Sequence, residues 1–153
     1  MRFYLLDRVT ECEPGKLARG VKNVTLSEDF LDEHFAGIPI MPGTLILEGL
    51  AQLSGYLLAR TASPDAPHKH KAVLSMVEKA KFRQVVRPGD QLKFEARLVT
   101  IRDDSGKVDA SATVEGEVVV SAQLVFYFAD LKNDLLEANR REIFSIWTTG
   151  ASE

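Results

Sequence analysis

Residues 44–59 read Thr-Leu-Ile-Leu-Glu-Gly-Leu-Ala-Gln-Leu-Ser-Gly-Tyr-Leu-Leu-Ala, and Glu48 is the only charge among them. Apolar side chains would fall on nearly every side of a helix formed by this run, which predicts a helix buried all round. A lone carboxylate in such a helix is costly to ionise, so we expect Glu48 to keep its proton and to act as a general acid. Gln52 lies one turn further on, on the same face, where its side chain can orient the carboxyl group.

The rest of the chain predicts strands around this helix. Residues 92–98 alternate apolar and polar side chains, as a half-buried antiparallel strand does. Further strands are predicted at 17–25, 72–82, 108–114 and 117–128. Residues 102–107 predict a hairpin turn in which Gly106 takes a positive φ. An antiparallel sheet wrapped around one long apolar helix accommodates both patterns, so we predict an α+β fold.

A histidine precedes the helix in a segment that cannot itself be helical. Pro39 and Pro42 lack amide donors and push the residues before them toward extended geometry, and Gly37 and Gly43 add backbone freedom. His34 therefore lies in a loop that leads into the helix. Taken alone, a histidine and a glutamate at this spacing are more often a loop histidine satisfied by backbone and a glutamate paired with a distant arginine.

The surrounding residues change this interpretation, because the segment from His34 to Gln52 resembles a known signature. In the 3-hydroxyacyl-[acyl-carrier-protein] dehydratases of type II fatty acid synthesis, the signature runs approximately Gly-His-Phe-Pro-Gly-x-Pro-x-Met-Pro-Gly-Val-Leu-x-Leu-Glu-Ala-x-Ala-Gln. This chain follows it without a gap, and weaker likeness covers about residues 3–128. Glu33 and Ala36 depart from the pattern, since they stand where the family usually has Gly and Pro.

The resemblance implies the hotdog fold and the dehydration of 3-hydroxyacyl carrier-protein thioesters to trans-2-enoyl thioesters. In that reaction a neutral His34 would take the α-proton, and Glu48 would protonate the departing hydroxyl while Gln52 orients it. The backbone amides of Gly43 and Gly37 are the candidate donors to the thioester oxygen. No cofactor is expected, because the substrate would arrive on the phosphopantetheine arm of acyl carrier protein.

A single sheet of this kind leaves an edge strand open, and continuing the sheet across a two-fold axis would cover it. We therefore expect a homodimer. The resemblance implies that each active site is composite, with His34 of one subunit facing Glu48 of the other. The family resembled also forms trimers of dimers, and the sequence does not decide between the two states.

One basic segment stands out in a chain whose net charge is −3. Residues 68–87 hold six basic side chains against Glu78 alone. Because carrier proteins are acidic, this segment is a candidate docking surface, although charge runs are often solvated faces without a partner. The six residues are Lys69, Lys71, Lys79, Lys81, Arg83 and Arg87. The segment lacks interleaved aromatic residues, so it does not favour nucleic acid.

Length and composition predict one soluble domain. The 153 residues are 45% hydrophobic, enough for one core, and no run approaches the ~20 apolar residues of a membrane span. The first residues turn charged too early for a signal peptide, and the lone Cys12 fits a reducing cytoplasm. We assign residues 1–130 to the hotdog domain and 131–153 to a helical extension packed on it.

The extension carries apolar side chains at helical spacing, namely Leu131, Leu135, Leu136, Ile143, Ile146 and Trp147. An amphipathic helix is therefore expected, either as a stabilising cap or as a wall of the acyl tunnel.

Two other functions remain open from the sequence. A hotdog thioesterase would hydrolyse the thioester with a carboxylate-activated water, and a non-catalytic acyl-binding subunit would result if Glu33 and Ala36 disabled the base. No metal site is expected, because His68 and His70 have lysine neighbours and no third ligand nearby.

Overall fold

The computed structural model describes residues 3–150 and is built around one long helix. This helix, α1 (Gly43–Ala62), confirms the helix predicted at 44–59 and extends it at both ends. Its buried side chains point in almost every direction, and Leu50, Leu53, Leu57 and Leu58 are fully enclosed. The all-round apolar pattern is thus explained by a helix that is covered on several sides at once.

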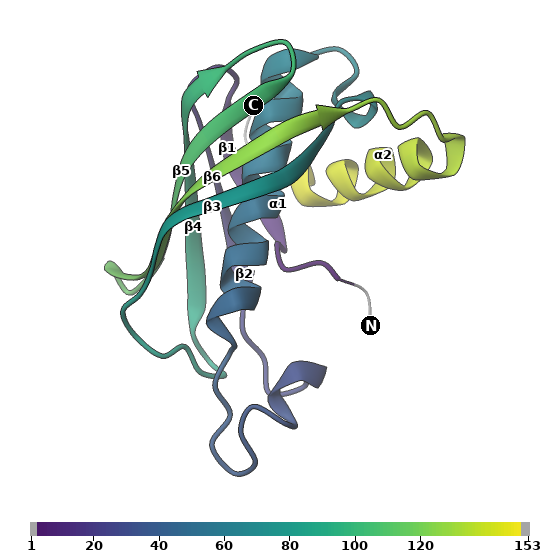
Figure 1. Ribbon diagram of the computed structural model, residues 1–153. Helices are drawn as coiled ribbons and strands as arrows, with labels where there is room; N and C mark the ends of the chain where they lie inside the picture. Colours follow the sequence, from purple (N-terminus) through teal and green to yellow (C-terminus); the bar gives the residue numbers. More distant parts are fainter. Residues whose placement is uncertain (1–2, 151–153) are drawn as a thin grey trace.

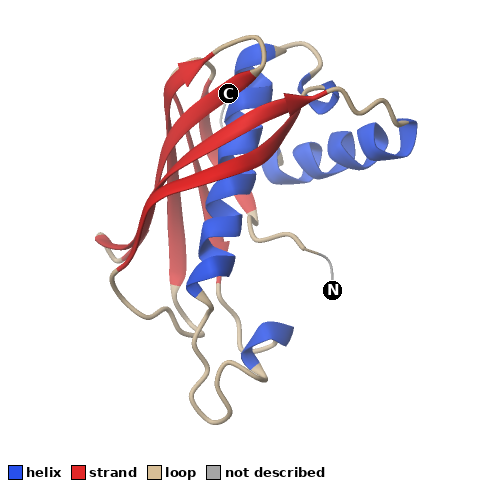
Figure 2. Ribbon diagram, in the orientation of Figure 1, coloured by secondary structure: helices blue, strands red, loops and turns tan. Residues whose placement is uncertain are grey.

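A six-stranded antiparallel sheet curves around α1, with strand order β1-β2-β4-β5-β6-β3 (Figures 1 and 2). The strands are β1 (Arg8–Glu13), β2 (Leu17–Asn23), β3 (Lys71–Phe82), β4 (Gln91–Ile101), β5 (Ser105–Val114) and β6 (Glu117–Ala129). Two short 3₁₀ turns, η1 (Asp29–Leu31) and η2 (Pro67–Lys69), lie in the connections on either side of α1. The predicted sheet wrapped around a helix, and with it the hotdog fold, is confirmed.

Alternation along the strands explains which face of the sheet is buried. In β4, Leu92, Phe94 and Ala96 are buried against α1, while the residues between them are more exposed. The prediction for Gly106 is wrong, since it lies inside β5 and is not among the glycines with positive φ. Its lack of a side chain serves packing instead, because a Cβ at Gly106 would lie 2.6 Å from a methyl carbon of Leu58.

Strand β3 forms one edge of the sheet and presents apolar side chains at its surface. Met76 is 51% exposed and Phe82 53% exposed, and Leu74 and Val77 are also exposed. Strand β3 pairs with β6 on one side, with register irregularities after Leu74 and after Glu78. An exposed apolar edge of this kind is a template for pairing with another strand.

The C-terminal extension forms a second helix, α2 (Asp134–Thr148), on the side of α1 away from the sheet (Figure 1). Asn133 caps its start by accepting a hydrogen bond from the Leu136 amide. The expected amphipathic helix is present, but its buried residues are Phe144 and Trp147. Leu131, Leu135 and Ile146, which the spacing also assigned to the apolar face, are exposed.

Candidate active site

His34 is held by hydrogen bonds within its own loop. Its Nδ1 lies 2.7 Å from the carbonyl oxygen of Ile40, and the Ile40 amide donates back to the His34 carbonyl at 2.8 Å. A carbonyl oxygen only accepts, so Nδ1 carries a proton, and this hydrogen bond selects the tautomer of the neutral ring in which Nε2 has the free lone pair. The imidazole also stacks on the ring of Phe35, with 4.0 Å between centroids. The loop thus fixes both the tautomer and the direction of the ring.

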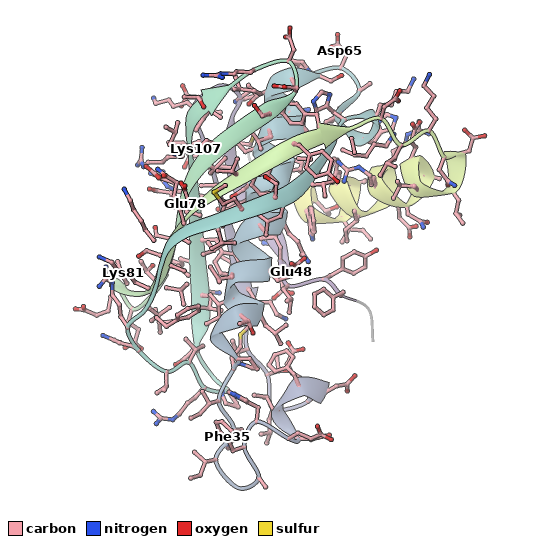
Figure 3. All side chains as sticks on the ribbon, in the orientation of Figure 1. Phe35, Glu48, Asp65, Glu78, Lys81 and Lys107 are labelled. Carbon is pink, nitrogen blue, oxygen red and sulfur yellow. The ribbon has the colours of Figure 1, made fainter. Side chains whose placement is uncertain are left out.

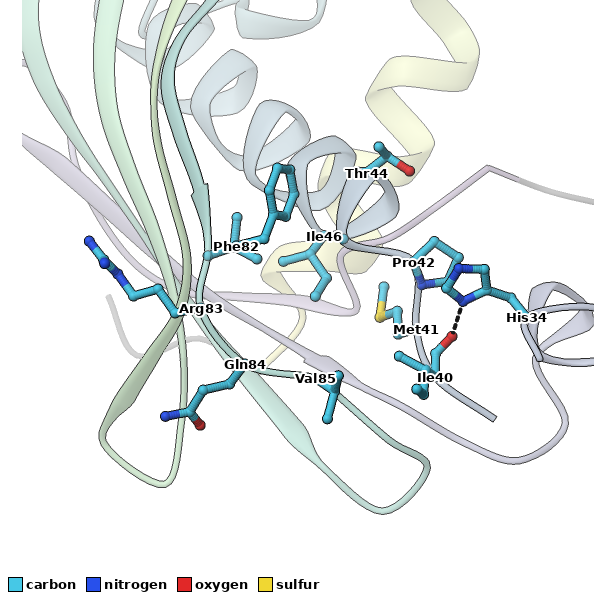
Figure 4. A pocket seen from close by; sticks show the side chains of 12 residues that line it. His34, Ile40, Met41, Pro42, Thr44, Ile46, Phe82, Arg83, Gln84 and Val85 are labelled. Atoms are coloured by element: carbon cyan, nitrogen blue, oxygen red, sulfur yellow. Dashed lines mark hydrogen bonds between the residues drawn. The ribbon is translucent and has the colours of Figure 1, made fainter. Parts of the chain in front are cut away.

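The imidazole faces a cavity of about 470 Å³ that opens at the start of α1 (Figure 4). Apolar residues dominate its walls, including Met41 and Ile46 from the α1 side and Phe82 and Val85 from the end of β3 and the following segment. The Met41 amide donates to the Val86 carbonyl at 2.8 Å, which ties the two walls together. This volume lies within the usual range of about 300–1,000 Å³ for small-molecule sites.

Gly43 begins α1 inside this cavity, directly after Pro42. A first-turn amide has no acceptor within its own helix, and the helix dipole makes this end favourable for negative charge. A Cβ at Gly43 would overlap the ring of Phe82, so glycine lets that ring lie directly against the start of α1. The position of Gly43 therefore suits a donor to a developing oxyanion.

Gly37 occupies a different place from Gly43. It has a φ of +78° in the tip of the loop, within a turn closed by reciprocal hydrogen bonds of 2.9 Å between Phe35 and Ile38. It does not line the cavity of His34 in this chain. The structure therefore brings Gly43 to the imidazole and leaves Gly37 apart from it.

Glu48 and Gln52 form the expected hydrogen bond, from Gln52 Nε2 to Glu48 Oε1 at 3.1 Å. The Leu5 amide donates to Gln52 Oε1 at 3.0 Å, and Gln52 Nε2 also donates to the Phe3 carbonyl at 2.7 Å. Because the Leu5 amide requires an acceptor, the carboxamide orientation is determined and Nε2 must point toward Glu48. Glu48 itself is half-buried in a single chain.

Glu48 and His34 do not share a cavity within one chain. Glu48 lines a smaller cavity of about 200 Å³ between α1, β3 and α2. Phe144 and Trp147 of α2 form part of its wall, and Tyr56 of α1 packs edge-on against Phe144 at 5.0 Å between centroids. Figure 3 shows Glu48 on the side of α1 that faces away from the sheet, far from the loop that carries Phe35.

Two titratable side chains of this cavity, Tyr56 and Arg140, have pKa values shifted by burial. Burial raises the pKa of the Tyr56 phenol, and it lowers the pKa of the Arg140 guanidinium. Sequence reasoning did not identify either residue as part of the site. The only signal was the helical spacing of the C-terminal residues, which does not reveal where that helix docks.

The six basic residues of the proposed docking segment divide into separate groups. Lys71 is buried and pairs with Glu137 of α2 at 2.7 Å, so its charge is not available to a partner. Lys69 is exposed in η2, at the other end of β3 from Arg87. Lys79, Lys81 and Arg83 line a polar groove on the outer face of the sheet. Figure 3 shows Lys81 on the side of the sheet away from α1. Arg83 lines both this groove and the cavity of His34.

Among residues 3–150, no three side chains of ligand type gather closely enough to hold a metal ion. His68 instead lies beside α2, with Nε2 at 3.0 Å from a guanidinium nitrogen of Arg141. Within the same residues, neither helix has the length and apolarity needed to cross a bilayer.

Comparison with solved structures supports the fold. The dehydratase heterocomplex ApeI:P from Xenorhabdus doucetiae matches with a TM-score of 0.67 at 17% identity, over 90% of this chain and 88% of that chain. The smu.793 protein of Streptococcus mutans, bound to acetyl CoA, matches with a TM-score of 0.62 at 18% identity, over 82% of this chain and 90% of that one.

The sequence relatives have a much higher identity to this chain than these solved structures have. The 3-hydroxyacyl-[acyl-carrier-protein] dehydratase FabZ of Clostridium acetobutylicum is 46% identical over 122 residues, which are 80% of this chain and 84% of the relative. The FabZ of Caldicellulosiruptor saccharolyticus is 42% identical over 81% of this chain and 86% of its own length. The family model described as a FabA-like domain matches residues 1–123, and the chain therefore belongs to the FabA-like family.

Proposed function

We propose that this protein dehydrates 3-hydroxyacyl-[acyl-carrier-protein] thioesters to trans-2-enoyl thioesters in fatty acid biosynthesis. It is a hydro-lyase, as its FabZ relatives are named. The observation that carries the proposal is the pair formed by a tautomer-fixed His34 and a Gln52-oriented Glu48, both on the motif shared with that family.

His34 acts as the base. The hydrogen bond from Nδ1 to the Ile40 carbonyl leaves Nε2 with a lone pair, which removes the proton from C2 of the acyl chain. The electron pair of that C–H bond forms the C2–C3 double bond. The developing negative charge on the thioester oxygen is stabilised by the Gly43 amide at the start of α1, and Gly37 is proposed as a second donor from the loop.

Glu48 acts as the acid. Its proton passes to the hydroxyl on C3, the C3–O bond breaks, and water leaves. Gln52 is a positioning residue, since its amide donates to Glu48 Oε1 and holds the carboxyl group in one orientation. After each turnover the proton on His34 returns to Glu48 through solvent, so neither an oxidant nor a cofactor is needed.

The site is proposed to be composite, across a homodimer. His34 and Glu48 line separate cavities within one chain, and the exposed apolar edge of β3 is suited to pairing with a second copy. Phe82, at the end of β3, lies against Gly43 and in the cavity of His34, so an interface along β3 would reach the catalytic groups. A trimer of such dimers remains a second proposed state.

The carrier protein is proposed to dock beside the cavity of His34. Lys79, Lys81, Arg83 and Arg87 are exposed along the end of β3 and the segment after it, where their charge would attract an acidic surface. Arg83 borders the cavity itself, so a phosphopantetheine arm entering there would pass a cation. Lys71 is left out of this surface because it pairs with Glu137. Such a carrier-dependent enzyme would work in the cytoplasm, as the sequence predicts.

The test is to incubate the protein with a 3-hydroxyacyl carrier-protein thioester and to follow the enoyl product. Glu48→Gln should lower kcat by about 10²–10⁴-fold while folding is retained, because a general acid is lost. Glu142→Gln makes the same chemical change at an exposed position on α2 and should leave turnover unchanged. Near-normal turnover in Glu48→Gln would remove Glu48 from the mechanism. Free acid in place of enoyl product would indicate a thioesterase, and no product at all an acyl-binding subunit.

A further inference from the structure

The cavity that contains Glu48 is closed by residues from outside the part of the chain that matches the family model. The match ends at residue 123, whereas α2 spans Asp134–Thr148. Phe144 and Trp147 of this helix line the same cavity as Glu48 and Gln52. The wall beside the proposed acid is therefore built partly by an element that lies beyond the FabA-like match.

This wall is held rigidly in place. Glu137 pairs with the buried Lys71 at 2.7 Å, and Arg140 donates to the carbonyl oxygens of His68 and His70 at 3.1 and 2.8 Å. The Trp147 indole donates to the Leu6 carbonyl at 2.7 Å. Two separate parts of the body, residues 68–71 and Leu6, thus fix α2, so the helix cannot shift without breaking these polar contacts.

The cavity leads away from Glu48 along α1, and Arg140 of α2 is among the residues that line it. It extends along α1 from Glu48 to Gly55, seven residues on, which at 1.5 Å per residue is about 10 Å. Ala72 and Leu74 of β3 line it opposite α2. Its volume of about 200 Å³ is smaller than the ~300–1,000 Å³ of common ligand sites, so the space for a chain is limited.

We propose that α2 forms the end wall of the acyl site and that Phe144 and Trp147 limit the length of the acyl chain that the enzyme accepts. The inference rests on the proposed function, because Glu48 must act at C3 for the rest of the chain to run toward Gly55. A chain that ends before Phe144 gains contact with each added methylene, worth about fourfold in affinity. A longer chain meets the Phe144 ring, which is held between Tyr56 and Trp147.

The chain supplies its own reporter, since Trp147 is the single tryptophan and lines the cavity. Saturated acyl pantetheines of increasing length lack the 3-hydroxyl and the double bond, so they bind without reacting. Titrating them while following Trp147 emission gives an affinity for each chain length. Wild-type affinity should rise by about fourfold per methylene and then stop rising at one length.

Two variants alter the depth of the cavity in opposite directions. Gly55→Ala should make the cavity shallower. The new Cβ is tolerated because the nearest atom outside the helix is the Ala72 Cβ at 4.0 Å. Alanine also favours helix over glycine, so weaker binding cannot be attributed to unfolding. Phe144→Leu should lengthen it. Ile146→Ala, on the exposed side of α2, is the matched apolar truncation that leaves the cavity intact.

The expected result is a shift in the longest chain that is accepted. Gly55→Ala should weaken the longest well-bound chain by at least about fourfold and leave shorter chains unchanged, whereas Phe144→Leu should favour longer chains. Equal changes at every length, or no response of Trp147 emission to any acyl pantetheine, would overturn the inference. Length-dependent binding without dehydration of any 3-hydroxyacyl thioester would overturn the proposed function alone.

Discussion

At the scale of single residues, the Gln52 side chain joins the carboxyl group of Glu48, the proposed acid, to the backbone of Phe3 and Leu5. Its oxygen accepts from the Leu5 amide, and its nitrogen donates both to Glu48 and to the Phe3 carbonyl. The same amide therefore orients an acid and anchors a segment. Its two roles predict effects on both turnover and stability.

Gln52→Ala should lower kcat by roughly tenfold or more, because Glu48 loses the donor that fixes its carboxyl group. KM should change little, since Gln52 is proposed to position the acid and not to bind the acyl chain. Leaving the Leu5 amide without an acceptor should also lower the free energy of unfolding by about 1–3 kcal/mol. Steady-state kinetics and urea denaturation measure the two effects.

Gln123→Ala is the control for Gln52→Ala. Gln123 lies on the outer face of the sheet and bonds to Asp109 at 2.8 Å, away from Glu48. Its loss should leave kcat unchanged. An unchanged kcat in Gln52→Ala as well would show that Gln52 does not orient the acid.

At the scale of elements, α2 contacts the segment that leads into β3, and His70 lies in this contact. The His70 ring packs on Phe128 at 4.2 Å between centroids, and its Nε2 is buried without a partner among the described residues. Burial, and then the charges of Arg140 and Lys71, lower the pKa of His70. In the unfolded chain the same imidazole regains its ordinary pKa of about 6.5.

This difference predicts how stability depends on pH. As the pH falls through about 6.5, the unfolded chain takes up a proton that folded His70 resists, so stability is complete above this pH and declines below it. The free energy of unfolding should therefore fall between pH 7.5 and 5.5, a range in which carboxylates with lowered pKa values, such as Glu137, remain charged. Urea denaturation across this range measures it.

His70→Gln should flatten this pH profile, because glutamine does not titrate. His68 also has a lowered pKa, mainly from burial and the neighbouring Arg141, so the variant should keep a smaller residual slope. An identical slope in His70→Gln and wild type would assign the pH dependence to other groups.

Elements with a strong repeating pattern were predictable from the sequence. The helix predicted at 44–59 follows from its long apolar run, and the strands β4 and β6 follow from alternation. Gly106 was misread because a glycine before a strand signals a turn, whereas its role depends on Leu58, forty-eight residues away. Lys71 was misread for a similar reason, since its partner Glu137 belongs to a helix whose docking position no local pattern reveals.

The motif nominates the residues of the candidate site, whose roles stay a prediction, but it does not give their geometry. The motif identified His34, Glu48, Gln52 and Gly43, and the Gln52–Glu48 bond follows from helical spacing. Spacing cannot show that His34 and Glu48 line different cavities, because that depends on how the loop folds away from α1. The role of Phe144 at the site was also hidden, for it requires the position of α2.

At the scale of the whole molecule, separate cavities for the base and the acid predict complementation between subunits. His34→Ala and Glu48→Gln homodimers should each be inactive. After subunit exchange, half of the dimers are mixed and each has one intact site, so activity should rise to about a quarter of wild type. A pair within one chain would give no recovery despite proven exchange.

The matching control mixes wild type with the double variant His34→Ala/Glu48→Gln. Every site of such a mixed dimer lacks one group if the sites are composite. Exchange at equal amounts should then reduce activity from about half to about a quarter of that of wild type alone. If His34 and Glu48 of the same chain formed each site, activity would stay at about half of that of wild type alone.

The exposed basic residues at the end of β3 and after it lead to a prediction about carrier docking. Reversing the charge of Lys79, Lys81 and Arg87 should raise KM for the carrier-linked substrate several-fold and weaken its dependence on salt, because long-range attraction is lost. A pantetheine thioester lacks the acidic protein surface and should be affected much less. Equal losses with both substrates would point to damage in the fold.

The contact between the Trp147 indole and the Leu6 carbonyl joins residues 141 positions apart. During synthesis at ~5–20 residues per second, the carbonyl leaves the ribosome on the order of ten seconds before its partner. Leu5 and Leu6, which end up buried, must wait for α2 to be made. The nascent chain therefore completes this part of its fold only after α2 has been synthesised, and until then these apolar residues are available to chaperones.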